Sequence, residues 1–408
     1  MISEQANSQK WLSVIGIGED GISGLSPLAR SLLENADLII GGDRHLAMLP
    51  QSDRQERLVW KSPIARSIEE ITRRRDRLVS VLASGDPMCY GIGVTLIRHI
   101  SPNEMIIIPA QSAFSLACSK LGWSLMEVEL LSLCGRDPAL LNAFLYPNAR
   151  LLILSATKQT PIAVAKLLVA KGYGQSEMIV LERLGGEKER IIKGFANTWN
   201  RDNIADLNTI AVTCLADLDT VSLSRLPGLP DNVYHHDGQL TKKEIRAITL
   251  AALAPLPGQL LWDIGAGSGS ISIEWMRSDR RCRAIAIEQN QQRIKYISDN
   301  AAALGVPNLK IVQGVAPNIL KGLPQPNTIF IGGGLTSDRL WQTCWDILPL
   351  KGRLVANSVT LEGEQKLLEL QQNLGGELTR ISVSRAEPLG KFQAWKAIAP
   401  VTQWVGIK

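Results

Sequence analysis

Three glycines alternate with other residues in the segment Leu261–Gly269, LWDIGAGSG, which lies between an apolar strand-like run and a helix-like one. Because glycine has no Cβ, Gly265, Gly267 and Gly269 let the backbone turn tightly and approach a bound ligand. The helix that follows offers free backbone N–H groups to an anion. A strand, a glycine turn and a helix in this order predict an α/β sheet with a nucleotide-type cofactor site.

The glycine spacing distinguishes between two cofactors. A dinucleotide fingerprint places its third glycine one position later, where this chain has Ser270. Asp263 precedes the glycines, and Glu288 ends the next expected strand, where a carboxylate can accept hydrogen bonds from both ribose hydroxyls. The pattern favours S-adenosylmethionine (SAM) over NAD. The simpler alternative is a tight turn with Glu288 as a solvated strand end.

Two further stretches belong to the same expected site. Phe330–Gly334, FIGGG, ends a later strand, and three glycines there leave room for a bulky, flat substrate. The simpler alternative is a flexible loop. In His235–Glu244, HHDGQLTKKE, Thr241 and Glu244 have the spacing of a capping box. That role is compatible with His236, Asp237, Gln239 or Thr241 also covering the cofactor.

Two prolines and a glycine interrupt the periodic pattern at Leu226–Asp231, LPGLPD. With 408 residues and 45% hydrophobic content, the chain is long enough for two cores, expected at residues 1–222 and 223–408. Strands and helices alternate in both, which predicts two α/β domains. The expected strands are 11–17, 38–40, 78–82, 105–108, 151–154, 179–181, 210–214, 259–264, 283–288, 309–312, 328–331 and 353–358, and expected helices include 27–34, 90–99, 112–121, 241–254 and 290–304.

Composition excludes several functional classes. A net charge of +5, with tryptophans that are not interleaved with basic clusters, argues against nucleic-acid binding. Six scattered cysteines, a polar N-terminus and short apolar runs favour a soluble cytoplasmic protein. Four dispersed histidines make a metal site improbable, and we expect His45 and His99 to be surface or packing residues.

The second half resembles the decarboxylating precorrin methyltransferase domain of cobalamin biosynthesis. The resemblance rests on the 235–244 segment, the glycine loop, the strand ending at Glu288, Gly314–Pro317 and the FIGGG run. Relatives usually carry a charged residue where this chain has Val315. The resemblance implies that SAM is held by Thr241, Gly265, Ala266, Gly267, Ser268, Gly269, Glu288 and Ala316.

The first half resembles the tetrapyrrole (corrin/porphyrin) methylase family over residues 11–220. The motifs in order are VIGIG at 14–18, ASGDPMCYG at 83–91, PAQSAF at 109–114, SLCGR at 132–136 and LERLGG at 181–186. In that family SAM lies in a cleft between two α/β subdomains, and the GIG loop would face the substrate. Relatives usually have His at Cys134 and a Thr-Asp type pair at Ser155-Ala156. The resemblance implies SAM contacts from Gly85, Asp86, Pro87, Ser112 and Ala113.

The fusion resembles the two-domain decarboxylating methyltransferases of the cobalamin pathway. It implies methylation of carbons 5 and 15 of precorrin-6Y, or its cobalt form, with decarboxylation of the ring C acetate to give precorrin-8. The first half would methylate carbon 5 and the second half would do the rest, with His236 or Asp237 transferring a proton. Such proteins are usually dimers or tetramers. The alternatives are an RNA or protein methyltransferase on the same folds and a non-catalytic SAM-binding module.

Overall fold

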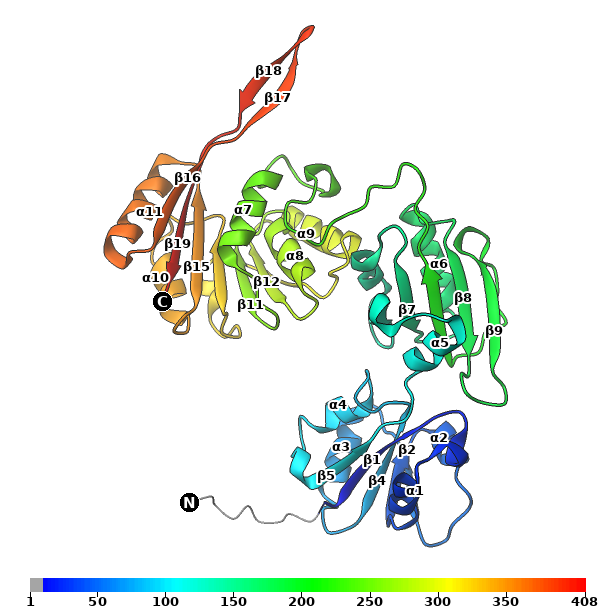
Figure 1. Ribbon diagram of the computed structural model, residues 1–408. Coiled ribbons are helices and arrows are strands. Elements are labelled where there is room, and N and C mark those ends of the chain that lie inside the picture. The colour runs from blue at the N-terminus through cyan, green and yellow to red at the C-terminus, as the bar shows by residue number, and fades with distance from the viewer. Residues whose placement is uncertain (1–9) are drawn as a thin grey trace. The chain divides into compact units, whose positions relative to one another are not determined.

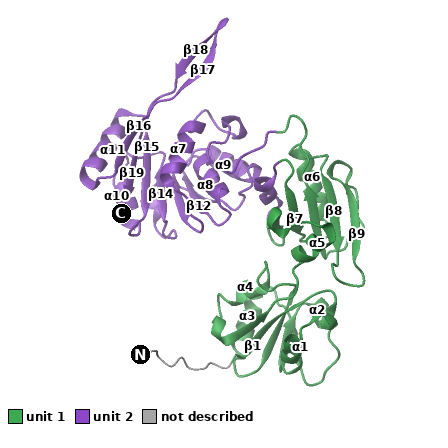
Figure 2. Ribbon diagram, in the orientation of Figure 1, with its two compact units in different colours: residues 1–136, 147–220 green, residues 137–146, 221–408 purple. Residues whose placement is uncertain are grey.

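The computed structural model describes residues 10–408, which form two compact units (Figure 2). Unit 1 contains the chain up to residue 136 together with residues 147–220, and unit 2 contains residues 137–146 and 221–408. Segment 137–146 groups with unit 2 although it precedes the Leu226–Asp231 break. Within residues 10–408, no helix is long and apolar enough to cross a lipid bilayer.

Unit 1 begins with a five-stranded parallel sheet of order β3-β2-β4-β1-β5 (Figure 1). Its core packs on both faces of the sheet. Helix α1 begins where the sequence favours a helix start, because Ser26 accepts a hydrogen bond from the Ala29 N–H and Pro27 occupies the first turn. The elements are β1 Leu12–Ile17, α1 Pro27–Glu34, β2 Leu38–Gly41, α2 Asp43–Ala47, β3 Glu56–Val59, α3 Ile64–Thr72, β4 Val79–Ser84, α4 Ile92–Leu96 and β5 Met105–Ile108.

A second, mixed sheet completes unit 1, with the order β6-β7-β10-β8-β9. Ser112 caps helix α5 by accepting from the Ser115 N–H, and Gly122 ends it in a left-handed conformation. The elements are α5 Ala113–Leu121, β6 Glu129–Ser132, β7 Arg150–Leu154, α6 Thr160–Ala170, β8 Glu177–Glu182, β9 Arg190–Phe195 and β10 Asn208–Thr213. Five-residue α2 and α4 are the shortest α-helices of this unit.

Unit 2 contains a seven-stranded sheet of order β13-β12-β11-β14-β15-β19-β16. The first five of these strands are parallel, and β19 runs antiparallel to β15 and β16. A two-stranded hairpin, β17–β18, projects from this sheet (Figure 1). The elements are α7 Lys243–Leu253, β11 Leu260–Ile264, α8 Ser270–Ser278, β12 Arg283–Glu288, α9 Gln291–Ala303, β13 Lys310–Gln313, β14 Thr328–Ile331, α10 Leu340–Ile347, β15 Arg353–Ser358, α11 Leu361–Leu374, β16 Glu377–Ile381, β17 Ser384–Leu389, β18 Phe392–Ala397 and β19 Val401–Ile407.

Successive side chains of β11 point to opposite faces of this sheet and contribute to the hydrophobic core on both. Leu261 packs in the cluster formed with α7, α8 and α9, whereas Trp262 and Ile264 pack in the cluster formed with α10 and α11. A strand that is buried on both faces is nearly all apolar, and in β11 Asp263 alone interrupts the apolar run that predicts this strand.

The expected α/β class is confirmed, and strands β5, β12, β14 and β15 have the expected bounds. The expected capping box is wrong. Lys242, not Thr241, is the N-cap of α7, and no side chain caps this helix. Glu244 instead binds Arg385, at 2.5 Å, and the Thr241 carbonyl accepts from Arg246. The Glu244 carboxylate, which the local motif would use, is therefore bound by a partner that is distant in the chain.

Candidate active sites

A cavity of about 720 Å³ lies at the carboxyl edge of the unit 2 sheet. The chain runs from β11 outward to β13 and then resumes at β14 on the other side of β11, so the strand order reverses between β11 and β14. Ligands of open α/β sheets bind at such a switch point. Most of the residues predicted to hold SAM line this cavity: Thr241, Gly265, Ala266, Gly267, Ser268, Glu288 and Ala316.

The glycine loop after β11 has the backbone that its sequence predicts. Gly265 and Gly267 have φ values of +72° and +59°. A Cβ on Gly265 would lie 2.8 Å from the Gly333 Cα, so the backbone of the FIGGG loop approaches Gly265 too closely for any side chain there. Gly269 does not line the cavity. A Cβ on it would lie 2.9 Å from a side-chain carbon of Ile297, so this glycine serves packing against α9.

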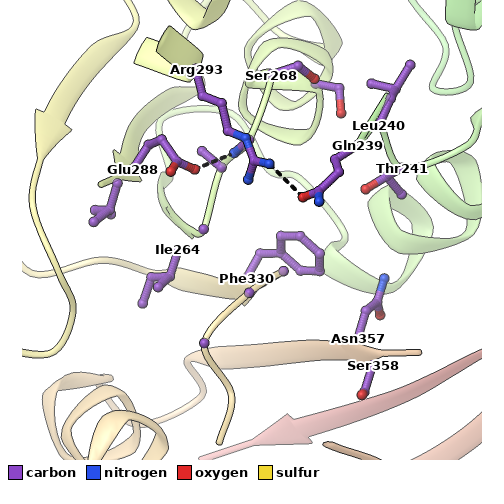
Figure 3. A pocket seen from close by; sticks show the side chains of 18 of the residues that line it. Gln239, Leu240, Thr241, Ile264, Ser268, Glu288, Arg293, Phe330, Asn357 and Ser358 are labelled. Carbon is purple, nitrogen blue, oxygen red and sulfur yellow. Dashed lines mark hydrogen bonds between the residues drawn. The ribbon is translucent and has the colours of Figure 1, made fainter. Parts of the chain in front are cut away.

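Glu288 holds a carboxylate at the cavity wall (Figure 3). Its Oε2 accepts from the Gly267 N–H at 2.9 Å, and its Oε1 accepts from the N–H groups of Gln289 and Asn290. These backbone donors fix the carboxylate beside the glycine loop. Each carboxylate oxygen has more than one acceptor site, so the group can still accept from a ligand hydroxyl.

Asp263 lies outside the cavity lining and is buried. Its Oδ2 accepts from both the N–H and the hydroxyl of Ser272, at 3.1 and 2.6 Å. Burial raises the pKa of this carboxyl to about 6, against the opposing effect of the Ser272 hydrogen bonds. Asp263 therefore fixes the first turn of α8 behind the glycine loop.

The segment before α7 reaches the cavity through Gln239, Leu240 and Thr241. Arg293 from α9 holds it there, because its Nη2 donates to the Gln239 Oε1 at 2.7 Å (Figure 3). Its Nε donates to the Asp237 carboxylate at 2.8 Å. The Arg293 guanidinium lowers the pKa of Asp237. His236 accepts from the Gly238 N–H through Nδ1. Neither His236 nor Asp237 lines the cavity, so their catalytic role stays a prediction.

The far end of the cavity contains polar side chains that the sequence patterns did not single out. Asn357 at the end of β15 donates to the Thr249 hydroxyl and accepts from the Gln403 amide, both at 2.9 Å. Figure 3 shows Asn357 and Ser358 across the cavity from Glu288. Because β15 is a parallel neighbour of β14, its carboxyl end lies at the same edge of the sheet, where ligands bind. Val315, where the family resemblance leads us to expect a charged residue, also lines this cavity.

A second cavity, of about 460 Å³, lies within unit 1. The predicted residues Gly85, Asp86, Ser112 and Ala113 line it, and Pro87 does not. A Cβ on Gly16 would overlap the Gly85 carbonyl, so the GIG loop and the Gly-Asp-Pro loop lie in direct contact.

Sequence reasoning missed a polar cluster in this cavity. Arg44 forms an ion pair with Glu19, and its Nη2 donates to Ser84 at 2.9 Å and to Nε2 of His45 at 3.0 Å. Burial, and then the charge of Arg44, lower the pKa of His45 to about 4, so its imidazole is neutral at ordinary pH. His45 was expected at the surface or in packing. The missed signal is Gly41-Gly42, which ends β2 at the carboxyl edge.

Two of the positions at which the family resemblance leads us to expect other residues also lie here. The Cys134 thiol donates to the Ser155 carbonyl at 3.2 Å, and the Ser155 hydroxyl donates to Asn208 at 2.5 Å. Cys134 and Ser155 line the cavity. Ala156 does not line it, and its N–H donates to the Thr160 hydroxyl at 3.1 Å.

Comparison with known proteins matches each half of the chain to a protein family. A family model described as tetrapyrrole (corrin/porphyrin) methylases matches residues 12–198, and one described as a precorrin methyltransferase domain matches residues 232–408. A protein of Sinorhizobium sp named precorrin-6Y C(5,15)-methyltransferase (decarboxylating) is 46% identical over 402 residues, which are 98% of this chain and 97% of that protein.

Two shorter relatives each match less than half of the chain. A cobalt-precorrin-7 C(5)-methyltransferase of Salmonella typhimurium is 34% identical, covering 44% of this chain and 88% of that protein. A probable cobalt-precorrin-6B C(15)-methyltransferase (decarboxylating) of Pyrobaculum calidifontis is 32% identical, covering 43% of this chain and 93% of that protein.

Proposed function

Because the chain belongs to the precorrin-6Y C(5,15)-methyltransferase (decarboxylating) family and is a methyltransferase of cobalamin biosynthesis, we propose that its two cavities divide the reaction. The unit 1 cavity would methylate carbon 5 of the tetrapyrrole. The unit 2 cavity would methylate carbon 15 and decarboxylate the ring C acetate. The observation that carries the proposal is that each unit has its own cavity at a glycine-rich carboxyl edge. The shorter relatives, named for one reaction each, support the same division.

The residues present suit SAM in both cavities. In unit 2, Glu288 offers a fixed carboxylate, and Gly265 and Gly267 offer a backbone without side chains. In unit 1, Gly85 has a φ of +58° and lines the cavity with Ser112. When bound, SAM supplies a methyl group on a positively charged sulfur, which is electrophilic.

The remaining work of the protein is alignment. The meso carbon of a reduced tetrapyrrole is enamine-like, so the substrate supplies the nucleophile, and orientation alone contributes a large part of the rate. The conjugated ring likewise accepts the electron pair that decarboxylation releases. Gly332–Gly334 leave space for a flat ring, and Asn357 and Ser358 face that space with polar groups. Proton transfer by His236 or Asp237 stays a prediction, because neither lines the cavity.

A matched pair of glycine substitutions tests the division. Gly85→Ala and Gly265→Ala both add a Cβ at positive φ, 2.9 Å from the Gln111 carbonyl oxygen and 2.8 Å from the Gly333 backbone respectively. With precorrin-6Y and SAM carrying a ¹³C methyl, NMR resolves the two new methyl groups and mass spectrometry detects loss of carbon dioxide. We expect G85A to lose only the carbon 5 methyl and G265A to lose the carbon 15 methyl with decarboxylation. Equal loss of both products in each variant would contradict the division.

We also propose that the chain forms a homo-oligomer through the β17–β18 hairpin. Phe392 and Trp395 on this hairpin are each 78% exposed, and Leu389 is 65% exposed. A two-stranded hairpin alone is marginally stable in water, and exposed apolar groups mark contact surfaces. Light scattering after size exclusion should show a dimer or tetramer that the double substitution F392S/W395S dissociates. A monomeric wild-type protein would contradict this proposal.

A further inference from the structure

Arg183 follows β8 and has a backbone conformation that residues with side chains rarely adopt. Its φ is +48°. In that region the Cβ crowds the following carbonyl, so glycine is strongly preferred, and an arginine there is an outlier. Glycines stand nearby at positions 185 and 186, but position 183 itself is an arginine. Outliers of this kind gather at functional sites, so the side chain of Arg183 calls for an explanation.

The turn that carries Arg183 is fixed against the cavity of unit 1. The Arg183 N–H donates to the Leu207 carbonyl, and the Arg183 carbonyl accepts from the Gly186 N–H, both at 3.1 Å. A Cβ on Gly186 would lie 2.6 Å from the Cβ of Glu19, so the turn rests on the residue that follows the GIG loop. Arg183 is half-buried and lines the same cavity as Glu19.

Within residues 10–408, no hydrogen bond or ion pair joins the guanidinium of Arg183 to another side chain. Its charge acts only at longer range on the neighbouring Glu182, where, against the opposing effect of burial, it contributes to the lowered pKa of that carboxyl after the hydrogen bonds from Arg190 and Ala205. The adjacent carboxylate of Glu182 is already occupied by both Nε and Nη2 of Arg190 and by the Ala205 N–H. Arg44, which lines the same cavity, is paired with Glu19. Arg183 is thus the lining cation, within the described chain, that remains available to a ligand.

We propose that Arg183 binds a carboxylate of a ligand in the unit 1 cavity, either an acid side chain of the tetrapyrrole or the carboxylate of the methionyl part of SAM. The planar guanidinium suits a carboxylate, which it can bind with two parallel hydrogen bonds. This inference rests on the proposed function, because both candidate ligands come from the carbon 5 methylation assigned to this cavity.

Three variants of the full chain separate the side chain's role from its backbone strain. Arg183→Gly removes the guanidinium and relieves the strain, and Arg183→Lys keeps the charge. Asn148→Gly is the matched control, because Asn148 lies in unit 1 with a φ of +64° and is exposed outside the cavity lining. The assay follows the carbon 5 and carbon 15 methyl groups separately with ¹³C-methyl SAM. The KM of each ligand is measured for the carbon 5 step.

We expect R183G to keep its thermal midpoint and its carbon 15 methylation, while one KM of the carbon 5 step rises roughly 10- to 100-fold, the range for a charge-assisted hydrogen bond. R183K should recover part of the loss, and N148G should match the wild type. A rise in the tetrapyrrole KM identifies a substrate side chain as the ligand, and a rise in the SAM KM identifies the methionyl carboxylate.

R183G with both KM values and its carbon 5 rate unchanged would overturn the inference and leave the proposed function intact. A wild-type chain that adds no methyl group at carbon 5 would overturn both.

Discussion

Arg246 is a fully buried arginine in unit 2. Its removal should lower the free energy of unfolding more than the loss of a surface ion pair would. Its Nε donates to Glu274 at 2.8 Å and its Nη1 to Asp231 at 2.9 Å. It also donates to the carbonyls of Thr241 and Leu229. Arg246→Met keeps much of the side-chain volume but leaves these acceptors without a donor.

The expected loss of unfolding free energy depends on the hydrogen bonds that Glu274 keeps when Arg246 is removed. Breaking one partner of a buried ion pair costs about 3–5 kcal/mol, because the other charge stays buried. Glu274 keeps hydrogen bonds from the N–H groups of Gly228 and Leu229 and from the Tyr234 hydroxyl. The lower end of that range, about 3 kcal/mol, is therefore expected.

Urea unfolding followed by tryptophan fluorescence measures this cost in the full chain. The matched control is Arg281→Met, which breaks an ion pair to Asp279 whose side chains are 65% and 28% exposed. Such a pair contributes about 0–1 kcal/mol. The double variant R246M/E274Q should recover part of the loss, because it removes the stranded charge. An R246M chain no less stable than R281M would refute the reasoning.

Three further substitutions test the two cavities. Gly16→Ala should slow carbon 5 methylation by roughly 100-fold, because a Cβ that overlaps the Gly85 carbonyl forces the two loops apart by about 1 Å. The rate of carbon 15 methylation by the same variant is the control. An unchanged rate of carbon 5 methylation would contradict this prediction. Glu288→Gln should raise the SAM KM of carbon 15 methylation roughly 10- to 100-fold, because an amide cannot accept from every backbone N–H that the carboxylate now binds. His45→Gln should flatten the pH dependence of stability between about pH 6.5 and 4. Folded His45 stays neutral to about pH 4 whereas the unfolded imidazole binds a proton near 6.5, so in the wild type about 3 kcal/mol is lost as the pH falls through that interval. Urea titrations at several pH values check this, and equal slopes in both proteins would contradict it.

The parts of the site that depend on one strand and its next turn were predictable. The glycine loop and Glu288 lie at the ends of β11 and β12, and fully buried strands read as apolar runs. The capping box at Thr241 failed because Arg385 binds Glu244 across 141 residues, and no local pattern contains that pairing.

Residues that are brought together by strand order were missed for the same reason. Arg44 and Ser84 meet because β2 pairs with β4, which periodicity along one strand does not indicate. Strands β3 and β9 were not predicted because their residues are half-buried or exposed and include charged side chains. Available cations such as Arg183 become visible only when the partners of the surrounding charges are known.

The most direct test of the whole account is a mass spectrum of the pigment after the purified protein has been incubated with SAM and precorrin-6Y. The account predicts gain of two methyl groups and loss of one carbon dioxide in the same product. A pigment of unchanged mass, from a protein that still binds SAM, would contradict it.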